Sequence, residues 1–355
     1  MTYLLAFAGF AVLIVLHEAG HFAAAKAVGM RVERFFLFFP PKLVSFRRGE
    51  TEYGIGAVPL GGFVKITGMN PDEELPPEVA PRAYYHQPVW KRIFVIAAGP
   101  AVNIAIAFAI LFILAFNVQE PTDSVDQIEP GSPAAGKLVS GDRILAVDGV
   151  SASQAELAER IDSHECAGDP SDGCRAATPA EITVQRDGAE RQVRIRPFYD
   201  AAIDRNRVGF AFGLRPTDPG TLEAAGIAGE FMWMVASRTI SVIGRLFEAE
   251  QRRQLSGVVG SYEVTRQAID TDLRQALTLI AVISLSLGLI NLFPFLPLDG
   301  GHIFWSLVEK VRGSPVSFRI MERAGLVGFA LVIMLFMIGF TNDIGRLTGE
   351  GFAVR

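Results

Sequence analysis

The chain has 355 residues, of which half are of apolar types, and 35 glycines add about a tenth more. A soluble globular domain has about 45–50% apolar residues with glycine included, so the composition excludes a compact water-soluble protein. The net charge of -5 and the lack of a basic patch or tail give no sign of nucleic-acid binding. Two cysteines, Cys166 and Cys174, are too few for a disulfide scaffold or a zinc cluster of thiolates.

The first apolar stretch runs from Met1 to Met30 and is interrupted by ionisable residues at positions 17, 18 and 21. No positively charged segment precedes it, which argues against a secretory signal peptide. Ionisable residues inside a membrane span are costly and by default mark function. We therefore expect the first span to contain a functional site.

The interruption has the pattern His-Glu-x-x-His. On a helix, residues four apart share one face, so the imidazoles of His17 and His21 can bind one ion. Zinc accepts histidine nitrogens and keeps one position open for water in catalytic sites, and Glu18 can take a proton from that water. The alternative, a hydrogen-bonded interior histidine pair, explains neither the glutamate nor the cost of burial. Ala24 and Ala27 occupy the positions where an extended zinc-protease pattern would have a histidine and a glycine.

Three later stretches meet the length of about 17–25 apolar residues that a membrane span requires. They are Ile93–Phe116, Ala276–Phe295 and Ala324–Phe340, and Asn103 is the only strongly polar residue of the first of these. With the first stretch, the sequence predicts four transmembrane helices.

Charge sets the expected orientation. The segment Lys26–Arg92 has ten Lys and Arg residues, whereas Asn117–Gly131 has none and four acidic residues. Cytoplasmic loops have the excess of Lys and Arg. This rule places Lys26–Arg92 and Asp299–Arg323 in the cytoplasm, and it places Glu120–Gln275 and both termini outside.

The outer segment from Thr122 to Phe198 reads as short strands separated by turns, with a hairpin at Asp187-Gly188. Gly131–Ala135 followed by Gly141–Gly149 resembles a bacterial PDZ domain. Such domains bind an extended peptide or a C-terminus as an added strand; a small domain that only blocks access is the alternative.

Two further features lie in this outer region. Leu222–Phe247 is an interrupted apolar stretch that fits either an amphipathic helix on the membrane surface or a helix packed under the outer domain. Outside the cytoplasm, Cys166 and Cys174 are expected to form a disulfide. A second metal site that includes His164 is the alternative.

A third metal ligand is expected at membrane depth. His86 and His164 lie in soluble segments, which leaves Asp299 and His302, after two prolines that interrupt a helix. The spacing does not decide between them. Asp299 is favoured because the adjacent Gly300-Gly301 gives a flexible backbone and because a carboxylate offsets part of the ion's charge.

The first-span motif paired with the later pattern Asn-x-x-Pro-x-x-Pro-x-Asp-Gly-Gly-His resembles the site-2 protease family of intramembrane zinc metalloproteases. The likeness is closest to the bacterial regulator-of-sigma-E protease type. Ile55–Lys65 is similar to that family's membrane-dipping β-loop, and Ala97–Asn103 is similar to its second-span signature. The resemblance implies Asp299 as the third zinc ligand and Asn291 as a polar partner of the substrate.

The resemblance also implies one catalytic Zn²⁺ and the hydrolysis of a peptide bond within or beside the transmembrane segment of a single-span protein. An anti-sigma factor or a remnant signal peptide would be the substrate, in regulated intramembrane proteolysis at the bacterial inner membrane. Gly61, Gly62 and Phe63 would form an edge strand that pairs with the substrate, with an ordinary hairpin as the alternative. A catalytically silent scaffold and a metal transporter are the rival functions.

The expected fold is an α-helical polytopic membrane protein with about four transmembrane helices, a membrane-dipping β-loop and an inserted extracytoplasmic PDZ-like α/β domain. Its expected parts are an N-terminal membrane core (1–120), the PDZ-like domain (121–200), a linker with an amphipathic helix (201–275) and a C-terminal membrane core (276–355).

Overall fold

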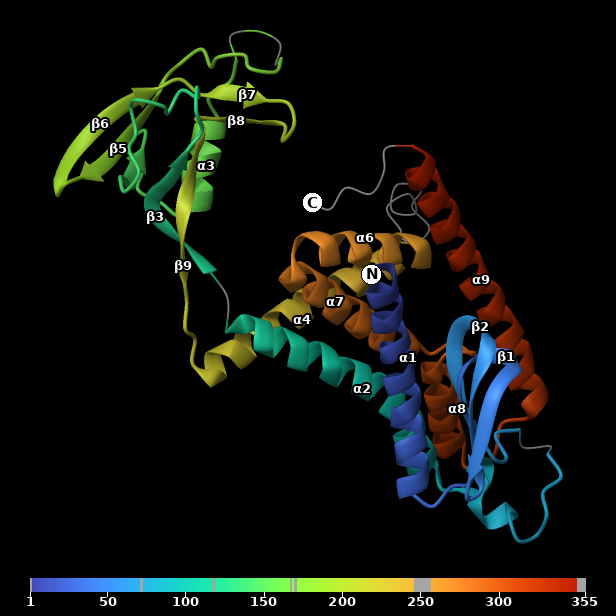
Figure 1. Ribbon diagram of the computed structural model, residues 1–355. Coiled ribbons are helices and arrows are strands. Elements are labelled where there is room, and N and C mark those ends of the chain that lie inside the picture. Colours follow the sequence, from blue (N-terminus) through green and yellow to red (C-terminus); the bar gives the residue numbers. More distant parts are fainter. Residues whose placement is uncertain are drawn as a thin grey trace. The chain divides into compact units, whose positions relative to one another are not determined.

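The computed structural model of the protein describes residues 2–70, 73–116, 119–166, 168, 171–245 and 257–349 (Figure 1). The chain forms two compact units. The first comprises Met1–Ala115 and Gly220–Arg355, and the second comprises Phe116–Pro219.

Four helices of the described chain, all in the first unit, are long and apolar enough to cross a membrane. They are α1 (Thr2–Ala27), α2 (Val89–Ala115), α7 (Leu273–Asn291) and α9 (Phe318–Thr348). At about 1.5 Å per residue, even the shortest is close to the roughly 30 Å thickness of the hydrocarbon core. This agrees with the four spans expected from the sequence. Helix α2 packs against both α1 and α7.

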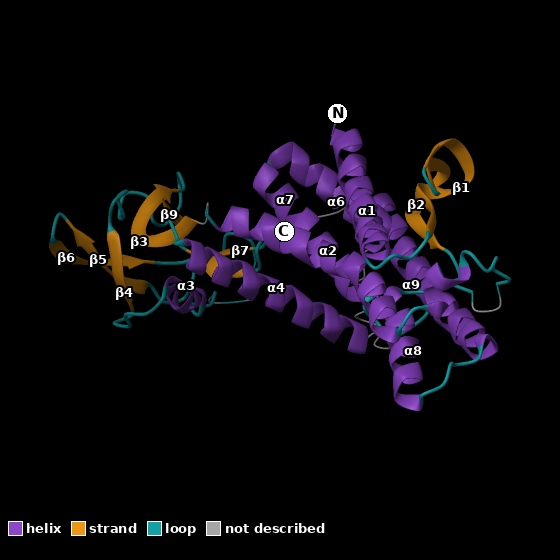
Figure 2. Cartoon of the chain, turned by 90° about the horizontal axis from the view of Figure 1, so that it is seen from below, coloured by secondary structure: helices purple, strands orange, loops and turns teal. Residues whose placement is uncertain are grey.

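The first unit also contains helices that are not among these candidate spans (Figure 2). They are α4 (Thr221–Gly244), α6 (Val258–Thr271) and α8 (Asp299–Arg312), with 3₁₀ turns at Ala80–Arg82 and Tyr84–His86. Helix α4 includes most of the interrupted apolar stretch, whose last residues lie outside the described chain. Its Ala228 is buried in a cluster with Ala107 and Leu111 of α2 and Ala281 and Leu285 of α7. The helix therefore lies against two of the candidate spans.

Strands β1 (Val32–Arg48) and β2 (Thr51–Ile66) form a bent sheet beside α1 (Figure 1). The register pairs residues 34–37 of β1 with residues 62–65 of β2 and also with residues 52–55. The second half of β1 pairs again with residues 51–55. Among the described residues, the segment 62–66 therefore has strand partners on one side only, so it forms an edge of the sheet.

The second unit is built on a five-stranded sheet with the order β6-β5-β4-β3-β9. The strands are β3 (Gln119–Ile128), β4 (Arg143–Val147), β5 (Ala180–Arg186), β6 (Ala189–Ile195) and β9 (Phe210–Pro216). A small ribbon of β7 (Phe198–Asp200) and β8 (Arg205–Arg207) and the helix α3 (Gln154–Asp162) complete it. Ser153 and Glu156 form a capping box at the start of α3.

The second unit is longer than the expected range 121–200. Strand β9 pairs with β3, and Val208 and Phe210 contribute to the same core as Val125. A strand that completes a sheet cannot belong to a linker, and nothing local in the sequence reveals its partner. Cys166 and Cys174 form a disulfide with a Cα–Cα distance of 6.1 Å, which confirms the expected bridge.

Candidate metal centre

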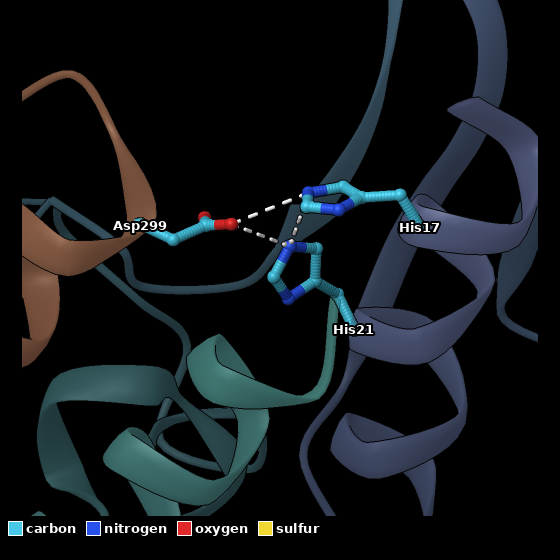
Figure 3. Close-up of side chains that lie close together, drawn as sticks. All are labelled: His17, His21 and Asp299. Carbon is cyan, nitrogen blue, oxygen red and sulfur yellow. Dashed lines mark hydrogen bonds and ion pairs between the residues drawn. The ribbon is translucent and has the colours of Figure 1, made fainter. Parts of the chain in front are cut away.

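Two helices bring three ligand-type side chains together (Figure 3). His17 and His21 lie one turn apart on α1 and are 7% exposed each, and Asp299 is the first residue of α8. The Nε2 atoms of the two histidines lie 3.3 Å apart. Asp299 Oδ2 lies 3.2 Å from Nε2 of His17 and 3.3 Å from Nε2 of His21.

These distances fit a metal ion. In a tetrahedral zinc site with bonds of about 2.0–2.1 Å, neighbouring ligand atoms are about 3.3–3.4 Å apart, so the three atoms can form one face of such a tetrahedron. Within the described chain, the buried Asp299 Oδ2 makes no hydrogen bond of good geometry, although both Nε2 atoms are near it. Two imidazoles and one carboxylate are a donor set that zinc accepts, and they leave one position open for water. The residues therefore fit the metal that the motif implies.

Close backbone packing holds Asp299 in place. A Cβ atom on Gly300 would collide with the backbone carbonyl of Leu292, and one on Gly301 would collide with the backbone of Leu296. Both glycines are buried in the first turn of α8. They are needed for close approach of two backbone segments, whereas the sequence suggested a need for flexibility.

An ion pair also anchors α8. The guanidinium of Arg92 in α2 donates to both carboxylate oxygens of Glu309 in α8, at 3.0 and 2.6 Å, and the Arg92 side chain is 2% exposed. Sequence reasoning missed this pair, because its members are separated by 217 positions. The only local signal was a pair of basic residues at the start of a span.

Helix α2 supports both histidines. The ring of His21 donates from Nδ1 to the carbonyl oxygen of Val95 at 2.9 Å, which leaves Nε2 free to bind an ion. A Cβ atom on Gly99 would overlap the same ring, so this position requires glycine. Nδ1 of His17 lies 3.3 Å from the side-chain amide of Asn103. The sequence singled out the segment 97–103 only through a family resemblance.

Glu18 lies next to the edge of the β1–β2 sheet. The backbone amide of Val64 lies near its carboxylate. A Cβ atom on Gly62 would lie 3.0 Å from Cγ of Glu18, so the absence of a side chain there allows the strand to approach. Phe63 stacks on the rings of Phe36 and Phe39, with centroids 5.4 and 6.0 Å apart.

The other residues that the sequence singled out, Asn291, Gly61 and His302, do not belong to the group of three ligand atoms. Asn291 is the last residue of α7, where the turn toward Asp299 begins, and it is half-buried. Gly61 has a φ of +156° and lies against the ring of Phe39. His302 lines a small pocket together with Arg92 and Glu309, and it does not join His17, His21 and Asp299 in the group of ligand atoms found in the described chain.

Comparison with known proteins agrees with this site. Residues 5–335 match peptidase family M50. A Brucella suis protein with a provisional zinc metalloprotease name is 32% identical over 359 residues, which cover 94% of this chain and 92% of that protein. Zinc metalloprotease Rip1 of Mycobacterium tuberculosis is 32% identical over 381 residues, which cover 93% of this chain and 94% of Rip1. The family match includes α2, α7 and α8 in full and α1 from its fourth residue on, and with them all three residues of the candidate metal centre. The chain therefore belongs to peptidase family M50, the site-2 protease family, and is a metalloprotease of the membrane.

Proposed function

We propose that this protein is an intramembrane endopeptidase that uses one zinc ion held by His17, His21 and Asp299. The observation that carries the proposal is the triangle of ligand atoms with edges of 3.2–3.3 Å. Two of its members lie within α1, a helix long and apolar enough to span a membrane. The zinc metalloprotease names of the relatives support zinc as the metal.

The chemistry follows from the residues around this triangle. A zinc ion at such a site supplies an activated water and polarises the scissile carbonyl. Glu18 takes the proton from that water and returns it to the leaving amine. The nearby backbone amide of Val64 is placed to orient the Glu18 carboxylate for this task.

The substrate is a single-span membrane protein whose helix unwinds at the scissile bond. A helix hides its carbonyl groups in internal hydrogen bonds, so the segment must become extended before attack. The edge segment that includes Gly62 and Phe63, directly after Gly61, suits this step, because an extended peptide can pair with the open side of an edge strand. Gly62 allows that strand to lie beside Glu18, and Phe63 is held by its ring contacts. Asn291, at the end of α7, is the polar group that would contact the substrate backbone.

The cellular setting follows from charge and family. The Lys and Arg asymmetry supports a cytoplasmic side for the segment with the β1–β2 sheet and an outer side for the second unit. The family resemblance supports a bacterial inner membrane, into which this sheet would dip. Anti-sigma factors or remnant signal peptides are the expected substrates, cleaved in regulated intramembrane proteolysis. The second unit acts as a PDZ-like module, for which β9 is an edge strand that can accept an extended peptide.

Co-expression with a tagged single-span test substrate tests this function. The wild type should release a shortened product, whereas Glu18→Gln should reduce cleavage by about 10²–10⁴-fold, because it keeps the metal ligands and removes the proton acceptor. Immunoblotting measures the product, and mass spectrometry of its new terminus should place the cut within or beside the membrane segment. Normal cleavage by zinc-loaded Glu18→Gln would contradict the mechanism.

A further inference from the structure

Asn103 is a buried polar residue with no role in the mechanism above. It lies in the middle of α2 and is 0% exposed. Burying an amide in apolar surroundings costs free energy unless the amide forms hydrogen bonds. Its backbone carbonyl accepts a hydrogen bond from the Ser284 hydroxyl of α7 at 2.9 Å, but that contact does not involve the side chain. The side chain instead faces His17.

A histidine that binds a metal through Nε2 must keep its proton on Nδ1, and a neighbouring acceptor holds the proton there. For His21 that acceptor is the carbonyl oxygen of Val95. For His17 the group next to Nδ1 is the Asn103 amide, with Nδ2 at 3.3 Å. The other end of the amide, Oδ1, is buried and has no hydrogen-bond partner within the described chain.

The two ends of an amide have nearly the same shape, and a half-turn about the last side-chain torsion exchanges them. After this turn, Oδ1 accepts the Nδ1 proton of His17, and Nε2 is free to bind the ion. Before the turn, Nδ2 donates to a bare Nδ1, and the proton is on Nε2, which lies 3.2 Å from Asp299 Oδ2. The amide can therefore serve either tautomer of His17.

We propose that Asn103 is a positioning residue that holds His17 in the metal-binding tautomer. Val95 and Asn103 lie on the same helix, so α2 would support both histidines of α1 from outside the metal site. The inference rests on the proposed function, because it requires His17 to be a ligand. It assigns a role to the one strongly polar residue of the apolar part of this span.

The test measures zinc affinity of the purified full-length protein in detergent by competition with a chromogenic chelator, which needs no substrate. Asn103→Leu has a similar size and no acceptor, so it should bind zinc about 10–100-fold more weakly. Asn103→Asp should bind zinc as tightly as the wild type or more tightly, because a carboxylate can only accept the Nδ1 proton. Ser284→Ala is the matched control: it removes the buried contact between α7 and the Asn103 backbone, leaves the amide in place and should keep wild-type affinity.

Three results would overturn the inference. They are wild-type affinity in a folded Asn103→Leu protein, a tenfold or larger loss in Asn103→Asp, and an equal loss in Ser284→Ala, which would show a packing effect. Thermal unfolding of the metal-free proteins checks the fold, and the aspartate variant decides alone if the leucine variant does not fold. His17→Ala separates the two proposals. Wild-type zinc affinity in that variant would refute the metal centre itself, whereas its loss together with unchanged affinity in Asn103→Leu would refute only the role of Asn103.

Discussion

Gly99 lies where the imidazole of His21 passes the backbone of α2. Any larger residue would place its Cβ atom on the ring. Gly20 of α1 makes a similar approach to the backbone of Ala98, so small residues on both helices allow this contact, as they do in many membrane helix pairs. The position of His21 thus depends on the lack of a side chain at Gly99 as much as on its hydrogen bond to Val95.

Gly99→Ala should therefore displace His21 and lower zinc content. The collision is with a ring fixed by the Val95 carbonyl, so the ring cannot move without losing that bond. Metal analysis of the purified variant measures the effect. Gly345→Ala, a helical glycine in α9 with open space around it, is the control and should keep its zinc. Full zinc content in Gly99→Ala would show that the site tolerates the shift.

The same metal analysis distinguishes Asp299 from His302 as the third metal ligand. Asp299→Asn should lose zinc and cleavage, because the carboxylate oxygen completes the triangle with the two histidines. His302→Ala should keep its zinc and much of its activity, since this ring lies in the pocket beside Arg92. Loss of zinc from the histidine variant together with retention by the aspartate variant would reverse the assignment.

At the scale of elements, β4 and β5 of the second unit are joined by a partly buried ion pair. Asp142, just before β4, accepts from Arg186 of β5 at 2.6 and 2.7 Å and from the backbone of Val139 at 2.8 Å. The Asp142 side chain is 0% exposed. The hydrogen bonds from Arg186 hold the pKa of Asp142 below its ordinary value.

This pair should make the stability of the second unit depend on pH. A carboxyl group with a lower pKa in the folded state stabilises fully above the unfolded pKa of about 3.9, and the effect is lost as the pH falls through the folded pKa. Asp142→Asn should lower the free energy of unfolding of the second unit at neutral pH, because it removes the negative charge that pairs with Arg186, and the difference from wild type should shrink in acid. Hydrogen exchange of β4 and β5, corrected for the intrinsic rate at each pH, measures it.

Asp123→Asn is the control for this experiment. Its ion pair with Arg143 is exposed on both sides, at 55% and 58%. Such surface pairs contribute about 0–1 kcal/mol, so this variant should resemble the wild type at every pH. If Asp142→Asn lowered the stability of the second unit by the same amount at every pH, the ion pair would not be the cause of the loss.

At the scale of the whole molecule, the orientation in the membrane stays a prediction from charge. Single cysteines can test it, because both native cysteines form a disulfide. Gly49 and Gly188 are at turn positions with φ of +61° and +78°, which disfavour a side chain. The exposed neighbours Arg48 and Ala189 lie in strands and are better sites.

In intact cells, Arg48→Cys should be shielded from an impermeant thiol reagent, and Ala189→Cys should be labelled. Both should react after the membrane is permeabilised, which controls for local accessibility. The physical reason is the excess of Lys and Arg in the segment before α2. Labelling of Arg48→Cys but not of Ala189→Cys in intact cells would show that the protein has the opposite orientation in the membrane.

The sequence by itself determined the four long apolar helices and the common face of His17 and His21. Both follow from local properties, the length of an apolar run and the period of a helix. It also named the Cys166–Cys174 pair and reduced the third ligand to two candidates three positions apart. Each of these inferences needs only residues close together in the chain.

Only the tertiary structure decided what lies around the histidines. It brings Asp299 from α8 to within 3.3 Å of both rings, through the close packing at Gly300 and the Arg92–Glu309 pair. It also places β9 in the sheet of the second unit and Asn103 beside His17. These contacts join residues that are tens to hundreds of positions apart, and they depend on how whole helices and strands pack. Such packing cannot be predicted from a pattern of residues that are close together in the chain.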